Sequence, residues 1–302
     1  MDMDTKSNFQ DDLLRSYSDT ELVSRIHSSP SPASTRGISL LSSNFLSKFY
    51  RPHEAEDMIR ATDIACQLGI RVPALKRIVR DGEDTYCVMD RIPGRTLEEA
   101  WTQLSWFLTI KLGFQLRRFI QHLRSVTSPV AGSLATGECR SFYLEDRYGL
   151  PARCSSRDME YFFRFWINFT SMKKAMQTAD QPEIPTPEGQ MLSTEPFVFT
   201  HHDLAPRNII LSPSDEIWIL DWDLAGFYPI YFEYAGMQNF IMPQHWGFFA
   251  RLRWHLFSWI AAGYWGREAS ILERMRFKFT RFAVGRRFHL LKNGGPSRYP
   301  AS

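Results

Sequence analysis

The stretch FVFTHHDLAPRNIILSPSDEIWILDWDLAGFYP, residues 197–229, decides the fold of this chain. It contains three short apolar runs rich in β-branched residues, which predict strands at 198–200, 209–211 and 217–220. The composition of residues 212–215, SPSD, predicts a turn, so the second and third strands would pair as a hairpin. Asp203, Asn208 and Asp221 would then lie at the rims of these short strands.

Two carboxylates and one amide in this arrangement fit the chemistry of phosphoryl transfer. One carboxylate accepts or orients the proton of the attacking hydroxyl, while an amide oxygen and a second carboxylate hold Mg²⁺ against the nucleotide phosphates. Any one of these residues alone is common in an ordinary polar turn of a hairpin. The full set, at kinase-like spacing between apolar strands, favours phosphoryl transfer over that alternative.

The pattern HxDxxxxN at residues 201–208, followed by ILDWD at 219–223, resembles the signature of the aminoglycoside phosphotransferase and choline kinase group. That group consists of small-molecule relatives of protein kinases, whose own catalytic loop has Asp and Asn at the same spacing. The residues around the motif, Arg207 and AGFYP at 225–229, are similar to those of the fungal members. The family pattern usually has glycine at the position of His202, so this chain must accommodate a side chain there.

The resemblance implies an α+β, bilobal protein-kinase-like fold with a small β-rich N-lobe and a mainly helical C-lobe. The expected division is an extension at 1–27, a nucleotide-binding N-lobe at 28–92 and a C-lobe at 93–302. The resemblance also implies ATP and Mg²⁺ as cofactors. Asp203 would orient and deprotonate the acceptor hydroxyl, and Asn208 and Asp221 would bind Mg²⁺.

The N-lobe contributes a candidate phosphate-binding lysine. An aromatic-rich run at residues 45–50 predicts a strand that carries Lys48, and a helix is expected to begin near Glu54. By the resemblance, Lys48 would hold the α- and β-phosphates and form an ion pair with Glu54, with Glu56 as the fallback partner. A solvated lysine on a strand is the alternative interpretation.

The segment from Asp90 to Leu97 is the expected hinge between the lobes. In relatives this segment contacts the adenine ring through backbone groups, so Met89 and Ile92 mark the expected nucleotide contact. A plain interdomain linker fits the same residues.

Several other side chains have two interpretations. Asp223 could support the metal, face the acceptor, or be a solvated acid in a turn. The aromatic cluster Tyr228, Tyr231, Phe232 and Tyr234 is more typical of a core than of a wall for a cationic acceptor. The basic C-terminal stretch that includes Arg286 is expected to be solvated, and residues 1–20 are expected to be loosely ordered.

Composition limits the function classes. A formal net charge of +3 over 302 residues gives no support to a nucleic-acid partner. The four cysteines lie far apart without a CxxC pair, which favours reduced thiols over disulfides or a zinc site. The N-terminus lacks a signal-peptide pattern, and residues 256–266 are too few to span a bilayer. The sequence therefore predicts a soluble, cytoplasmic protein.

Together these features predict an ATP-dependent, Mg²⁺-assisted phosphotransferase whose partner is a small-molecule hydroxyl acceptor. The competing hypothesis is a catalytically inactive kinase-like fold that serves as a binding or regulatory module, because the N-lobe is thin and poor in glycine. A protein kinase has weaker support, because no Ala-Pro-Glu motif follows Asp221. The sequence identifies neither the acceptor nor the oligomeric state.

Overall fold

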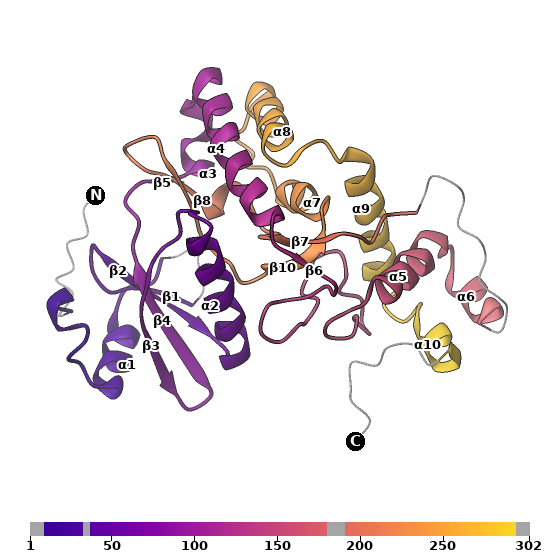
Figure 1. Ribbon diagram of the computed structural model, residues 1–302, viewed down its shortest axis with the longest axis horizontal. Coiled ribbons are helices and arrows are strands. Elements are labelled where there is room, and N and C mark those ends of the chain that lie inside the picture. The colour runs from indigo at the N-terminus through magenta and orange to yellow at the C-terminus, as the bar shows by residue number, and fades with distance from the viewer. Residues whose placement is uncertain (1–8, 33–36, 180–190, 294–302) are drawn as a thin grey trace.

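The computed structural model describes residues 9–32, 37–179 and 191–293. The chain forms an N-terminal part built on one antiparallel sheet and a C-terminal part that is mainly helical (Figure 1). The predicted α+β architecture, with a β-rich N-terminal part and a helical C-terminal part, is confirmed.

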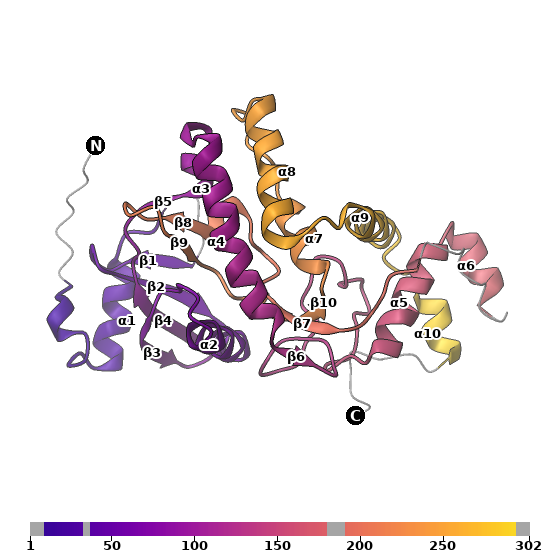
Figure 2. The same cartoon turned by 45° about the horizontal axis from the view of Figure 1, so that its top comes forward.

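The N-terminal sheet has the strand order β1-β2-β4-β3. Its strands are β1 (Ile38–Leu40), β2 (Phe45–Tyr50), β3 (Leu75–Asp81) and β4 (Asp84–Asp90). Because alternate residues of a strand face opposite sides, Tyr86 and Val88 of β4 join one buried cluster and Cys87 joins another. Helix α1 (Asp19–Ser28) covers the first face and α2 (Pro52–Gln67) the second, as Figures 1 and 2 show.

The segment that precedes α1 packs on the same sheet. Phe9, Leu14 and Tyr17 are buried together with α1, around the short 3₁₀-helix η1 (Asp11–Leu13). Arg77 of β3 fixes the segment, because its Nη1 donates a hydrogen bond to the Leu14 carbonyl at 2.7 Å. The expectation of loose order is therefore wrong for residues 9–20, whose apolar side chains gain from burial; residues 1–8 lie outside the described residues.

The C-terminal part contains the remaining described helices. They are α3 (Leu97–Ala100), η2 (Trp101–Gln103), α4 (Trp106–Arg124), α5 (Ser156–Asn168), α6 (Met172–Thr178), η3 (Pro206–Asn208), α7 (Phe232–Gln238), α8 (Phe248–Ala262), α9 (Gly266–Arg281) and α10 (Arg287–Asn293). Helices α4 and α8 pack side by side (Figures 1 and 2). Trp101 of η2 also contacts α8, because its Nε1 donates to the Ala250 carbonyl at 2.8 Å.

Two small antiparallel sheets carry the motif. One has the order β5 (Arg95–Thr96), β8 (Ile209–Leu211), β9 (Ile217–Ile219), and the other has the order β10 (Gly226–Pro229), β7 (Phe197–Thr200), β6 (Thr127–Ser128). Ile209 pairs with Ile219 and Leu211 with Ile217, so the predicted hairpin is confirmed.

The aromatic cluster after β10 is part of the core. Tyr228, Tyr231, Phe232 and Tyr234 are all buried, and the Tyr228 and Phe232 rings stack with centroids 5.5 Å apart. The interpretation as core is confirmed, and these side chains do not offer an open wall to a cationic acceptor.

The C-terminal arginine stretch is not entirely solvated. Arg286 is fully buried, its Nε lies 2.6 Å from Asp146 Oδ2, and its Nη2 donates to Asp146 Oδ1 at 2.7 Å. Trp166 Nε1 donates to the same carboxylate at 3.0 Å. The expectation of a solvated Arg286 is wrong, because a buried carboxylate compensates the charge locally.

In the described ranges, no helix combines the length and apolar character that a bilayer crossing requires. All four cysteines have free thiols, and three of them are buried.

Candidate active site

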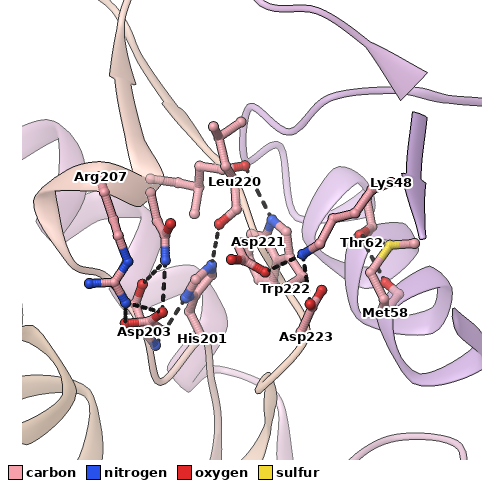
Figure 3. Close-up of polar contacts among 12 residues, drawn as sticks. Lys48, Met58, Thr62, His201, Asp203, Arg207, Leu220, Asp221, Trp222 and Asp223 are labelled. Atoms are coloured by element: carbon pink, nitrogen blue, oxygen red, sulfur yellow. Dashed lines mark hydrogen bonds and ion pairs between the residues drawn. The ribbon is translucent and has the colours of Figure 1, made fainter. Parts of the chain in front are cut away.

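The loop between β7 and β8 holds Asp203 in a fixed position. Asn208 Nδ2 donates to the Asp203 carboxylate at 2.8 Å and to its backbone carbonyl at 2.9 Å. Arg207 Nη2 donates to both carboxylate oxygens, at 2.9 and 2.7 Å (Figure 3). Burial raises the pKa of Asp203, and the Arg207 charge opposes that shift. The structure thus brings Asp203 and Asn208 together, as the motif predicts.

His201 joins this loop to the end of β9. Its Nε2–H donates to the Leu220 carbonyl at 2.9 Å, and its Nδ1 accepts from the Asp203 backbone N–H at 3.2 Å (Figure 3). The Leu220 N–H donates to the Asn208 carbonyl at 2.9 Å. Burial lowers the pKa of His201 to about 4, so the ring is neutral at pH 7. His201 therefore positions the loop next to Asp221, the residue that follows Leu220.

Glu233 of α7 binds the backbone of the loop between β7 and β8 and was not identified from the sequence. Its carboxylate accepts from the His201 N–H at 2.8 Å and from the His202 N–H at 3.0 Å. Burial raises its pKa to about 7, against the effect of these two hydrogen bonds. A Cβ at Gly236 would lie 2.3 Å from the His202 carbonyl oxygen, so glycine is required for this close approach. An acid in the otherwise apolar run 231–237 was the available signal.

His202 takes the position where the family pattern usually has glycine, and its backbone φ is 71°. The fully buried ring lies among Phe142, Tyr228 and Phe232, with centroid distances of 5.7, 5.1 and 5.6 Å. Its Nε2 lies 2.8 Å from Ser141 Oγ, and burial lowers its pKa to about 3. An aromatic pocket therefore accommodates the side chain, and the backbone keeps the left-handed conformation that favours glycine.

Lys48 of β2 reaches both acids at the end of β9. Its Nζ donates to Asp221 Oδ1 at 2.7 Å and to Asp223 Oδ2 at 2.6 Å (Figure 3). Burial alone would lower the pKa of Lys48, but the two carboxylates raise it overall. The structure thus brings Lys48 and Asp221 together, and it makes Asp223 a direct partner of Lys48 rather than a solvated acid.

The expected ion pair between Lys48 and Glu54 is not formed by these two described residues. Helix α2 begins at Pro52, so Glu54 lies in its first turn, and the Glu54 carboxylate accepts from the Arg51 N–H at 3.2 Å. Unpaired N–H groups at a helix start compete for such a carboxylate. The fallback residue, Glu56, pairs with Arg60 at 2.9 Å.

Asp57, one turn further along α2, makes the buried acidic contact of this helix. Its carboxylate accepts from the backbone N–H groups of Ala135 and Thr136 at 2.6 and 3.0 Å, and from Thr136 Oγ1 at 2.8 Å. Arg140 Nη2 donates to the same carboxylate at 2.5 Å. These bonds tie α2 to the C-terminal part, and no sequence pattern predicts them.

Met89 and Ile92 lie at the expected connection between the two parts. Met89 is in β4, where it pairs with Leu46 and Leu75, and Ile92 lies two residues after Asp90, the last residue of that strand. Their contact with adenine stays a prediction.

The acidic pair at the end of β9 fits a bound cation. Asp221 and Asp223 share the single charge of Lys48, and burial together with Asp221 raises the pKa of Asp223 to about 6. Asp223 Oδ1 is buried with no hydrogen-bond partner among the described residues. Mg²⁺ prefers such hard oxygen ligands. Since the described residues contain no metal-binding group of three or more His, Cys, Asp or Glu, the ion would also need oxygens from Asn208, phosphates or water.

Comparison with known proteins adds a family match. The model of a family described as "Phosphotransferase enzyme family" matches residues 32–269 of this chain. No curated protein sequence matches this chain. Nothing in these matches supports the narrower similarity to fungal members.

Three solved structures illustrate the structural likeness. A spectinomycin phosphotransferase in complex with ADP and spectinomycin is 14% identical over 86% of this chain and 81% of that chain, with a TM-score of 0.45. An aminoglycoside-3'-phosphotransferase of type VIII is 13% identical over 83% and 91%, with a TM-score of 0.48. The choline kinase LicA from Streptococcus pneumoniae is 12% identical over 90% and 95%, with a TM-score of 0.43.

Proposed function

Because this chain belongs to the phosphotransferase enzyme family, we propose that it transfers the γ-phosphoryl group of ATP to a hydroxyl of a small molecule. The observation that carries this proposal is the gathering of four polar side chains from separate segments. Asp203 is held by Asn208 in one loop, and Asp221 is held by Lys48 from the N-terminal sheet. ATP as the donor also fits a cytoplasmic location.

In the proposed reaction, Asp203 accepts the hydroxyl proton as the hydroxyl oxygen forms its bond to phosphorus. The bond between that phosphorus and the ADP oxygen breaks, and ADP leaves. The hydrogen bonds from Arg207 and Asn208 keep the Asp203 carboxylate oriented for this role. Most of the rate gain in such transfers comes from positioning and charge stabilisation.

Asn208 and Asp221 would hold Mg²⁺, with Asp223 beside them. When bound, Mg²⁺ neutralises phosphate charge. Lys48 would hold the phosphates after leaving its two aspartates, and Glu54 could orient Lys48 only after that change. Under this proposal residues 28–92, with the adenine contact at Met89 to Ile92, supply nucleotide binding, and residues 93–302 supply the catalytic loop and the acceptor site.

One observation favours the alternative of an inactive binding module. The Lys48 ammonium lies between Asp221 and Asp223, at 2.7 and 2.6 Å, where phosphates and a metal would need these groups. If that arrangement is permanent, the phosphate site is closed, so nucleotide binding is the property that separates the two functions.

Thermal unfolding with ATP, in the presence and absence of Mg²⁺, tests the proposal. At a ligand concentration of 100 Kd the folded state gains about 2.7 kcal/mol, which corresponds to a rise in Tm of roughly 5 °C for a chain of this size. We expect this rise only with Mg²⁺, and we expect Asp221→Ala to remove it.

Asp63→Ala is the matched control, because Asp63 is an exposed acid of α2 and the charge change is the same. Asp203→Asn should keep the nucleotide-dependent rise while losing transfer to any acceptor. Absence of a rise in wild type at millimolar Mg²⁺ and ATP would support the inactive module instead.

A further inference from the structure

A hollow of about 620 Å³ opens beside the catalytic loop, between the end of α7, α9 and the loop before α5. Arg207 lines it, and the same guanidinium donates to both oxygens of Asp203. Phe142 also lines it, and its ring centroid lies 5.7 Å from that of His202, the residue before Asp203. A molecule in this hollow would therefore lie next to the proposed catalytic base.

The lining of the hollow is richer in donors and positive charge than in acceptors. Arg207 and Arg276 carry two positive charges, and Glu273 is the acid among the described lining residues. Gln238 adds an amide Nε2 that is buried with no hydrogen-bond partner among the described residues. An unpaired buried donor is costly, so a ligand oxygen at this position would be favourable.

Of the two arginines in the lining, Arg276 has the more distant acidic partner. Arg207 is paired with Asp203, whereas the shortest contact from Arg276 to Glu273 is 3.9 Å and the Glu273 side chain is 63% exposed. Arg276 also donates to Asn239 Oδ1, a neutral group, and lies 5.8 Å from the Phe142 ring centroid. A guanidinium with these partners suits a carboxylate ligand, which can accept two parallel hydrogen bonds.

The remainder of the hollow is apolar and partly aromatic. Phe277 of α9 is 64% exposed and lines the hollow together with Phe142. Apolar rings beside a few convergent polar groups are typical of small-molecule sites. Arg276 would repel a polycation such as an aminoglycoside. A quaternary ammonium would find only the exposed Glu273 among the described lining residues, because Asp203 beside the hollow is already paired with Arg207.

Resting on the function proposed above, we propose that this hollow is the acceptor site and that its ligand is an apolar or aromatic hydroxyl compound with a carboxylate. The carboxylate pairs with Arg276, the apolar body contacts Phe142 and Phe277, and the hydroxyl faces Asp203.

Three probes with one scaffold test the charge preference. They are 4-(hydroxymethyl)benzoate, 1,4-benzenedimethanol and 4-(aminomethyl)benzyl alcohol, which share a ring and a hydroxyl but differ in charge. Binding is measured by titration calorimetry with Mg²⁺ and an unreactive ATP analogue present. We expect the anion to bind about tenfold more tightly than the neutral diol, from one charge-assisted contact, and the cation to bind most weakly.

Two arginine variants provide the matched comparison. Arg276→Gln should reduce the affinity of the anion to that of the neutral diol and leave the diol unchanged. Arg274→Gln, with the same charge change at an exposed position outside the lining, should alter neither. Glu273→Gln should strengthen anion binding. Preference for the cation, equal effects of the two arginine variants, or no binding of any probe at millimolar concentration would overturn the proposal.

This measurement separates failure of the acceptor proposal from failure of the proposed function. If anion binding depends on Arg276 but ATP causes no rise in Tm, the proposed ligand site stands and the proposed phosphotransferase function is rejected. If ATP raises Tm but the cationic probe binds most tightly, the proposed phosphotransferase function stands and the carboxylate class of acceptor is rejected.

Discussion

Replacing His202 with glycine tests whether side-chain packing outweighs backbone strain at this position. The ring is fully buried, and its Nε2 contacts Ser141 Oγ. Removing a large buried side chain costs about 2–5 kcal/mol, and losing the hydrogen bond costs about 1 kcal/mol. Glycine recovers about 1 kcal/mol because φ is 71° here, but its freedom in the unfolded chain costs up to about 1 kcal/mol. We expect the free energy of unfolding to fall by about 2–6 kcal/mol.

Urea denaturation followed by tryptophan fluorescence measures this change. His202→Ala is the informative comparison, because it deletes the same ring and keeps a Cβ in the left-handed region. We expect the alanine variant to be less stable than the glycine variant by up to about 1 kcal/mol. A glycine variant as stable as wild type would refute the dominance of packing. An alanine variant more stable than glycine would refute the positive φ.

Three further changes probe the supports of the site. Burial raises the pKa of Glu233 to about 7, so the folded state retains a proton that the unfolded chain releases above its ordinary pKa of 4.5; its contribution is fully present below pH 4.5 and is lost as pH rises through 7. The stability of wild type relative to Glu233→Gln, measured in urea, should therefore decrease between pH 5 and 7 by at most about 1.4 kcal/mol per pH unit, and a flat difference would contradict this. Asp146→Ala should lower the free energy of unfolding by about 3–5 kcal/mol, because Arg286 would stay buried without its partner; a loss below 1 kcal/mol in the same assay would show that the pair adds little. Deleting residues 1–17 should lower Tm and cost about 4–9 kcal/mol, since three buried apolar side chains, each contributing about 1.5–3 kcal/mol, are removed; an unchanged Tm would contradict the packing on the sheet.

The conformation of the loop that carries Asp203 and Asn208 was predictable because the residues that determine it are close in sequence. The strands, the hairpin and the grouping of Asp203 with Asn208 follow from short spacings between apolar runs and polar residues. A few residues of chain fix those distances, so the pattern alone limits the geometry.

The partners of Lys48 and the support of the loop depend on longer-range packing. Glu54 is where the motif predicts it, but the short connection from β2 to α2 leaves its carboxylate at the helix start. Lys48 pairs instead with Asp221 and Asp223, which are 173 and 175 residues away in sequence. Glu233 contacts the backbone of His201 and His202, which are 32 and 31 residues before it, and its role becomes visible only when α7 packs against the loop. No local pattern encodes such contacts.

The hydrogen bonds of Asp57 have a mechanical consequence. They fasten α2 to the loop at 135–140, and the Ile219 N–H donates to the carbonyl of Arg71, just beyond α2, at 2.9 Å. Helix α2 is therefore bonded to the C-terminal part, although in sequence it precedes two strands of the N-terminal sheet. A hinge movement of that sheet would have to slide the strands across α2, so that Lys48 travels with β2 while Asp57 stays in place.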